Sequence, residues 1–259
     1  YKSFEAGISL IFGKPIAVTK KYKNEMREFL RKFDWFLPNS EEEMKIVNFN
    51  FETDFINYSV IPNSVDFSKF PYYSNRLRRG YVSAARIEPI KNQLQLVDIC
   101  TGHNLDLMIV GAVTPNNIGY LKAVQNCSND AKNIKLITQN VDQRELGNIF
   151  NTHKVHILAS FRESPGLSSL EALSSGMNIV VSESEYCPID TYFKDLINKH
   201  VFICDPYSKK SIHKAMKIAH ELDSPAENLL KEFNWVNTAI KTFAVYENLF
   251  SKKNLGQVE

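Results

Sequence analysis

Short apolar runs and helical segments alternate along the chain from residue 80 onward. The apolar runs are typical of parallel strands buried on both faces, and strands are predicted at 81–84, 105–110, 134–137, 155–159, 178–181 and 201–204. Helices are predicted at 92–100, 117–126, 142–151, 208–222 and 226–234. This alternation predicts an α/β fold with a doubly wound, Rossmann-like parallel sheet.

The segment 159–176 joins two of these strands and is expected to contain a short helix. Ser164 is the expected N-cap, Pro165 fits the first helical position, and Gly176 fits just past the end. The first turn carries Gly166, Leu167 and Ser168, and its small residues let an anion approach the free backbone N–H groups. The helix dipole favours negative charge at the same place, so phosphate is the expected guest.

Two carboxylates lie eight positions apart in this segment, and they are expected to do different work. Glu171 lies about 9 Å along the helix axis from its start, at about 1.5 Å per residue. There it could accept hydrogen bonds from two vicinal hydroxyls, such as those of a ribose. Glu163 lies in the loop above the sheet, over the spot where a bound group would react. Two solvated glutamates are the alternative interpretation.

Two cations, Arg86 and Lys91, occupy the loop that follows the strand at 81–84. Ligands of open α/β sheets bind at the carboxyl ends of the strands, so both cations are expected to face the start of the helix in segment 159–176. Such a convergence predicts a diphosphate site that stabilises charge on a departing group. The alternative is an ion pair between Arg86 and Glu88, with Lys91 in solvent.

These motifs together resemble a known family, the retaining GT-B glycosyltransferases of family 4. The pair Glu163-x7-Glu171, followed by Ala172 and the Gly176 stop, resembles the donor-site motif of that family. The Arg-x4-Lys spacing resembles its GRxxxxK motif, with Ala85 where glycine is usual. The segment 61–66 reads IPNSVD and resembles the interdomain IPNGVD segment, with Ser64 in place of the glycine.

The resemblance implies transfer of a hexose from a UDP- or GDP-sugar to a glycan or lipid acceptor, with retained anomeric configuration. Arg86 and Lys91 would stabilise the leaving diphosphate, Glu171 would hold the ribose, and Glu163 would orient the sugar. Residues 164–168 would bind the donor at the start of the helix, and Val141 would neighbour the nucleobase. No cofactor beyond the donor and no metal is expected, since the DxD signature is absent from the sequence.

The 259 residues are 44% hydrophobic, which fits one large or two modest domains. Residues 1–62 are expected to be the end of an N-terminal acceptor domain and 63–79 a linker. Residues 80–234 form the expected donor domain, and 235–259 a C-terminal helix with an apolar stripe and a tail. Because the chain begins with Tyr1 rather than Met, a further N-terminal portion is expected to precede it.

The N-terminal region predicts a helix at 20–33, a short strand at 34–37 and a helix that starts after Pro38. The first helix is basic and amphipathic, so it could lie on an anionic membrane surface or pack on a neighbouring sheet. The net charge of +2 gives no reason to expect nucleic acid as a partner. The four cysteines are expected to be reduced thiols, and the protein is expected in the cytoplasm or at the inner face of the membrane.

Three kinds of function fit these features. The first is an active transferase. The second is a non-catalytic module that binds a nucleotide sugar and needs a further segment or a partner subunit for turnover. The third is a structural or regulatory α/β protein that kept the fold and lost the ligand. A zinc site at His153 and His156 is not expected, because no carboxylate or thiolate follows at ligand spacing.

Overall fold

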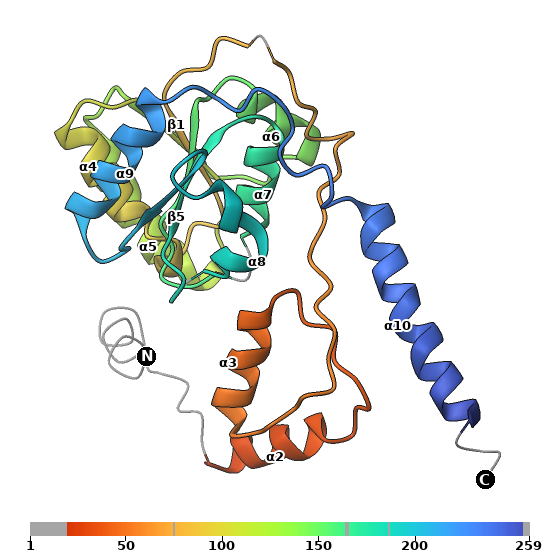
Figure 1. The fold of residues 1–259 in the computed structure, drawn as a ribbon. Helices are drawn as coiled ribbons and strands as arrows, with labels where there is room; N and C mark the ends of the chain where they lie inside the picture. Colours follow the sequence, from red (N-terminus) through yellow and green to blue (C-terminus); the bar gives the residue numbers. More distant parts are fainter. Residues whose placement is uncertain (1–19, 75, 164–165, 186, 256–259) are drawn as a thin grey trace. The chain divides into compact units, whose positions relative to one another are not determined.

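The computed structural model describes residues 20–74, 76–163, 166–185 and 187–255 (Figure 1). The chain divides into two compact units, Tyr1–Val60 and Ile61–Glu259. The sequence placed the corresponding boundary after residue 62. The second unit contains the sheet and all the motifs that predict a binding site.

Within residues 20–60, the described part of the first unit, the chain forms the helices α2 (Lys20–Leu30) and α3 (Glu41–Phe51). The Arg27 side chain joins them, because it donates to the Phe51 carbonyl (2.8 Å) and pairs with Glu52 (2.8 Å). The predicted start of α3 is confirmed: the Ser40 hydroxyl accepts from the Glu43 N–H at 3.0 Å.

The predicted strand at 34–37 is wrong. Only Phe36 pairs there, in an isolated bridge with Tyr58. The apolar side chains of this region make ring contacts instead, and Phe36 lies 4.8 Å from Phe55 between ring centroids. Aromatic packing rather than a ladder of backbone hydrogen bonds therefore organises this segment.

The second unit is built on a six-stranded parallel sheet, as the sequence predicts. Its strands are β1 (Tyr81–Ala84), β2 (Leu107–Val110), β3 (Ile134–Ile137), β4 (Val155–Leu158), β5 (Asn178–Ser182) and β6 (Val201–Cys204). Their order in the sheet is β3-β2-β1-β4-β5-β6. Strands β1, β4 and β5 are buried along their whole length, which explains why apolar residues predominate in them. The strand order reverses between β1 and β4, and this is where open α/β sheets bind ligands.

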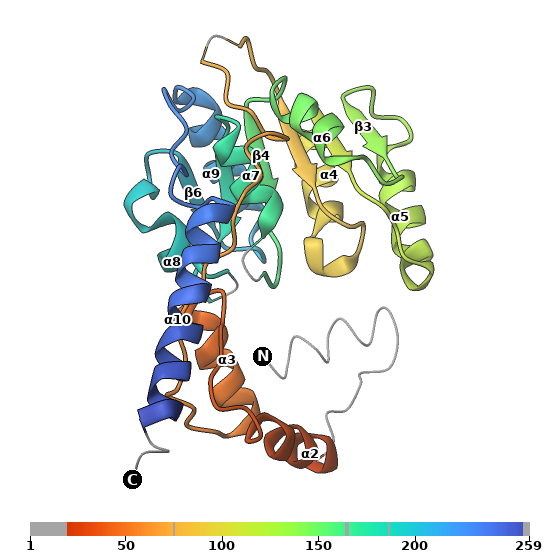
Figure 2. The same cartoon turned by 90° about the vertical axis from the view of Figure 1, so that its right-hand side faces the viewer.

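Helices cover both faces of the sheet (Figures 1 and 2). One face packs on α4 (Gln93–Gly102), α5 (Ile118–Ser128) and α9 (Lys209–Glu221), and the other on α6 (Gln143–Phe150), α7 (Leu167–Ser174) and α8 (Ile189–Phe193). Single turns of 3-10 helix lie at Pro89–Lys91, Pro115–Asn117 and Lys194–Leu196. The two layers bury separate apolar clusters, so the sheet is held rigidly from both sides.

The helix predicted at 226–234 does not form, and the segment is a series of turns. The Asn228 side chain accepts from the Leu230 N–H at 2.9 Å, and this local bond competes with the helical pattern. Leu230 is buried in the core, and the Phe233 carbonyl accepts from Val65 N–H at 2.8 Å. The segment therefore fixes the linker to the sheet domain instead of extending a helix.

The linker is also held by the buried guanidinium of Arg78. It donates to the carbonyls of Phe150 (3.1 Å) and Ser175 (2.5 Å), at the ends of α6 and α7, and to the Asn151 side chain (3.1 Å). A cation at two helix C-termini is favoured by both dipoles. Burial lowers the pKa of Arg78 to about 10, which still leaves it charged at neutral pH.

The chain ends its described part in the long helix α10 (Trp235–Leu255). Asn234 caps it by accepting from the Asn237 N–H at 2.9 Å, and Thr238 donates to the Pro62 carbonyl at 3.2 Å. Its expected stripe of apolar side chains is more than half exposed, as shown by Trp235, Phe243 and Phe250. None of the described helices has both the length and the hydropathy of a membrane span.

Candidate functional site

The loops that follow β1 and β4 meet at the carboxyl edge of the sheet, where the strand order reverses. The Phe161 N–H donates to the Ile90 carbonyl at 2.9 Å, and the buried Asn92 side chain donates to the Ala159 carbonyl at 3.1 Å. Asn92 has a φ of 60°, a left-handed conformation that asparagine tolerates better than most residues. These bonds fix the two loops against each other before any ligand is considered.

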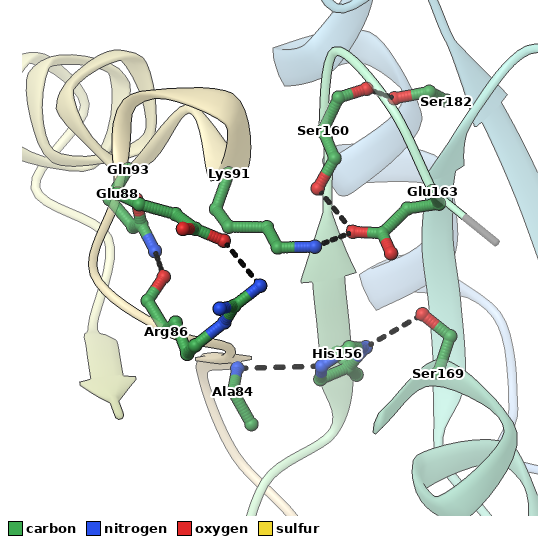
Figure 3. Close-up of polar contacts among 10 residues, drawn as sticks. All are labelled: Ala84, Arg86, Glu88, Lys91, Gln93, His156, Ser160, Glu163, Ser169 and Ser182. Carbon is green, nitrogen blue, oxygen red and sulfur yellow. Dashed lines mark hydrogen bonds and ion pairs between the residues drawn. The ribbon is translucent and has the colours of Figure 1, made fainter. Parts of the chain in front are cut away.

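Glu163 and Lys91 form an ion pair across these loops (Figure 3). The Lys91 Nζ lies 2.6 Å from Glu163 Oε1, and the Ser160 hydroxyl donates to the same oxygen at 2.7 Å. The two charged side chains are only 15% and 7% exposed. The Ser182 hydroxyl on β5 in turn donates to the Ser160 carbonyl at 2.5 Å. Glu163 is therefore held in one orientation by a network that reaches the neighbouring strand.

Arg86 comes from the same loop as Lys91, and both side chains extend toward the end of β4 (Figure 3). The Arg86 guanidinium pairs with Glu88 Oε1 at 3.2 Å, and the Arg86 side chain is 65% exposed. The alternative interpretation of this loop is therefore right about the Arg86–Glu88 pair. It is wrong about Lys91, which is not solvated but paired with Glu163.

The loop after β1 comes very close to the loop after β2. A Cβ added to Gly111 would lie 1.9 Å from the Ala85 carbonyl oxygen, so only glycine fits at that position. Ala85 stands where the resembling motif has glycine, and its backbone is nevertheless accommodated. The close approach of the two loops is provided by Gly111 instead.

Helix α7 begins at Leu167 with Gly166 as its N-cap, later than the start predicted at Pro165. The predicted cap Ser164 and the predicted first residue Pro165 lie outside the described residues. Gly166 has a φ of +78°, which takes the chain into the helix through the left-handed region. A Cβ there would lie 2.9 Å from a Leu158 methyl and 3.5 Å from Glu163 Oε2. The amino end of α7, with Leu167 and Ser168, therefore adjoins the Glu163 carboxylate.

Glu171 lies further along α7 in different surroundings. Its half-buried carboxyl has no hydrogen-bond or ion-pair partner within the described part of the chain. Burial raises the pKa of Glu171 to about 7, and the charge of Lys69 acts in the opposite direction. Such a carboxyl can bind a hydroxyl-bearing ligand at moderate cost, because its desolvation has already taken place.

Val141 follows β3, two strands away from β1, and is half-buried against the core. The following Asp142 caps α6 by accepting from the N–H groups of Arg144 (2.8 Å) and Glu145 (3.0 Å). The Lys69 side chain donates to Gln143 at 2.6 Å and also acts electrostatically on Glu171. Lys69 thus connects the region of Val141 with that of Glu171.

Two serines that hold Glu163 in place were not expected to do so from the sequence. Ser160 and Ser182 are common polar residues, and only the fold shows that Ser160 contacts Glu163 and that Ser182 contacts the Ser160 carbonyl. His156 is fully buried: it accepts from Ala84 N–H at 3.4 Å, and its Nδ1 lies 3.5 Å from the Ser169 hydroxyl (Figure 3). Burial lowers the pKa of His156 to about 3, so the ring is neutral. Among the described residues, no group of three metal-ligating side chains gathers here or elsewhere.

A doubly wound sheet with two cations and a buried carboxylate at its switch point defines an α/β protein suited to an anionic, hydroxyl-bearing ligand. The model of one family, the glycosyl transferases group 1, matches residues 69–233. The chain belongs to this family.

Solved structures show the same fold. A sucrose-phosphate synthase from Thermosynechococcus elongatus superposes with a TM-score of 0.72 at 16% identity over 90% of this chain and 63% of that one. A glycosyltransferase from Rickettsia africae gives 0.72 at 13% identity, over 90% and 68% of the two chains. A UDP-forming trehalose-phosphate synthase from Burkholderia xenovorans gives 0.63 at 11% identity, over 88% and 62%. These are GT-B glycosyltransferases, and this chain spans less than two thirds of the first of them. A search of curated proteins found no match.

Proposed function

We propose that the second unit is the donor-binding domain of a retaining glycosyltransferase of family 4. It would transfer a hexose from a UDP- or GDP-sugar to a glycan or lipid acceptor. Membership of the glycosyl transferases group 1 supports glycosyl transfer. Two further structures of the same fold support retention and a UDP-sugar donor. One, of trehalose-6-phosphate synthase, concerns glycosyl transfer with retention, and the other, from E. coli, is bound with UDP-2-fluoro glucose.

The observation that carries the proposal is the Lys91–Glu163 pair beside the amino end of α7. A cation, a carboxylate and free helical N–H groups lie together there, as a nucleotide sugar requires. The reaction breaks the bond between the anomeric carbon and the diphosphate oxygen and forms one from that carbon to an acceptor hydroxyl oxygen. Lys91 and Arg86 stabilise the negative charge on the departing diphosphate. Glu163 orients the sugar and steadies positive character at its anomeric carbon.

The remaining site residues hold the nucleotide in this proposal. Gly166, Leu167 and Ser168, at the amino end of α7, bind the diphosphate through backbone N–H donors. Ser164 and Pro165, which the sequence adds to this set, lie outside the described residues. Glu171 accepts hydrogen bonds from the ribose hydroxyls, and Val141 lies beside the nucleobase. Arg86 and Lys91 neutralise the negative charge of the diphosphate, a task that a metal ion performs in other enzymes. Nucleotide binding is therefore expected to persist in the presence of EDTA.

Calorimetric titration with UDP, GDP and their sugars tests the proposal. One of the two nucleotides should bind, and Arg86→Ala or Glu171→Ala should abolish or strongly weaken that binding. Failure of both nucleotides to bind would favour the structural or regulatory protein. Binding of the nucleotide sugar without release of its nucleotide would instead favour the non-catalytic module, which needs a further segment or partner.

We also propose that the protein works in the cytoplasm, at the inner face of the membrane, with α2 as a peripheral contact. Tyr22, Phe29 and Phe33 in and just after this helix are about half exposed, and Lys20 and Lys21 are exposed as well. The Lys23 and Arg27 charges are already paired with Glu52, which weakens the basic face. Co-sedimentation with anionic but not with neutral lipid vesicles would support this contact, and equal behaviour toward both would contradict it.

A further inference from the structure

Each of the two cations in the loop after β1 is paired with a carboxylate of this chain. Lys91 pairs with Glu163 at 2.6 Å, and Arg86 pairs with Glu88 at 3.2 Å (Figure 3). A diphosphate that binds both cations must compete with both carboxylates. The two competitors are not equivalent, because the proposed function gives Glu163 a second task at the sugar and gives Glu88 none.

In the Arg86–Glu88 pair, Arg86 is free to change its partner, whereas Glu88 is held in place. The Glu88 side chain is 14% exposed, and in the described chain its carboxylate has no other hydrogen-bond or ion-pair partner. The Arg86 side chain is 65% exposed, while its carbonyl is fixed by the Gln93 side chain at 2.8 Å. The Arg86 guanidinium can therefore swing from Glu88 to a ligand without movement of the backbone, and Glu88 stays in place to take it back.

We propose that Glu88 is a release residue, which sets the affinity and the dissociation rate of the nucleoside diphosphate by competing for Arg86. This inference rests on the proposed function, in which Arg86 binds the diphosphate. When the product leaves, the carboxylate of Glu88 replaces the phosphate oxygens at the guanidinium. Product release limits the turnover of many enzymes, so an acid in this position favours turnover at the expense of affinity.

The variant Glu88→Gln removes the charge and keeps the shape of the side chain. We expect it to bind UDP or GDP about two- to fivefold more tightly than the wild type, as estimated from the strength of partly exposed ion pairs. Dissociation of the nucleotide should slow by a similar factor. The matched control is Asp98→Asn, which removes one negative charge and breaks the Lys209–Asp98 pair on α4 and α9, outside the site. It should leave the nucleotide affinity unchanged.

A double-mutant cycle decides whether Glu88 acts through Arg86. In an Arg86→Gln background, Glu88→Gln should no longer raise the affinity. An equal gain in both backgrounds, or no gain in the wild-type background although the wild type binds the nucleotide, would overturn the inference and leave the proposed function standing. Failure of the wild type to bind UDP and GDP would overturn both. Glu88→Ala should change the affinity in the same direction as Glu88→Gln, and an unchanged thermal midpoint for both confirms that the variants are folded.

Discussion

Two glutamates of the same βα unit, Glu163 and Glu171, lie eight positions apart and meet opposite conditions. Glu163 is nearly inaccessible, and two donors, Lys91 and Ser160, converge on one of its carboxylate oxygens. Glu171 has no partner among the described residues, and burial raises its pKa to about 7. The Glu163 carboxylate is held in place by donors of the protein itself, whereas the Glu171 carboxylate would receive its hydrogen bonds from a ligand. The comparison predicts that Glu163 serves the chemical step and Glu171 serves binding.

The largest effect is expected from Glu163→Ala. It should reduce release of UDP or GDP from the corresponding sugar by at least about 100-fold, the scale seen when a group that stabilises a transition state is removed. Nucleotide affinity should stay within a few fold of the wild type, because Lys91 remains available to the diphosphate. Steady-state kinetics together with calorimetry separate the two quantities. A variant with normal turnover would remove Glu163 from its proposed role.

The next effect concerns binding alone. Glu171→Ala should weaken UDP or GDP binding by about 10- to 100-fold, the range expected for loss of hydrogen bonds to a charged group. The matched control is Glu227→Ala, which removes an exposed carboxylate paired with Lys231 far along the chain. If Glu171→Ala bound the nucleotide as well as Glu227→Ala and the wild type do, Glu171 would not serve binding, and the proposed difference between Glu163 and Glu171 would be lost.

The pH dependence sharpens the same comparison. Because the ionised carboxylate accepts the ribose hydrogen bonds, nucleotide affinity should be highest at pH values well above the Glu171 pKa of about 7 and should fall as the pH decreases through that pKa. Glu171→Gln should lose this dependence, and Glu163→Gln should keep it. Calorimetric titrations between pH 5.5 and 8.5 measure it, and an affinity that rises toward low pH in the wild type would speak against the assignment.

The same pKa has a consequence for stability. The folded-state pKa of Glu171 lies above its ordinary value of 4.5, so the folded protein favours the protonated acid. Its unfavourable contribution is absent at low pH, appears as the pH rises from 4.5 to 7 and is complete above that. Glu171→Gln should therefore raise the thermal midpoint at pH 8 and leave it unchanged at pH 4. A shift at pH 4 but not at pH 8 would contradict this sign.

The smallest effect is expected at Gly166, next to Glu163. Gly166→Ala should destabilise the fold by about 1–2 kcal/mol, because an L-residue is strained at its positive φ and the Cβ meets Leu158. Gly119→Ala on α5 is the control, since a Cβ there meets nothing within 4 Å and should be neutral or slightly stabilising. Equal unfolding free energies for the two variants would show that the turn at Gly166 is not strained.

Much of the fold could be predicted from the sequence, because the buried parallel strands are short, mostly apolar runs with clear ends. The bounds of β1, β3 and β6 agree with the prediction residue for residue. The composition of segment 226–234 favours a helix, but the Asn228 side chain accepts from the Leu230 N–H and turns the backbone instead. The residue types alone do not show whether the asparagine side chain or the helical hydrogen bonds will prevail.

The location of the site could be predicted from the sequence, but which carboxylate pairs with which cation could not. The parallel topology brings the loops after β1 and β4 together, so Arg86, Lys91 and Glu163 could be expected at one edge of the sheet. Lys91 and Glu163 are 72 positions apart, however, and which acid takes which cation depends on the geometry of both loops. The local Arg86–Glu88 pair could be anticipated because the two residues are neighbours, whereas the roles of Ser160 and Ser182 appear only in the folded chain.

The central claim is that the leaving diphosphate is bound by the cations of the loop after β1, and Lys91 tests it most directly. Lys91→Ala should weaken UDP or GDP binding by about tenfold or more, as expected for a lost charge-assisted contact. Lys209→Ala, which removes an exposed cation outside the site, should not. The double variant Lys91→Ala with Glu163→Ala should bind as weakly as Lys91→Ala alone. Recovery of wild-type affinity in the double variant would show that Lys91 only neutralises Glu163, and that result would contradict the account.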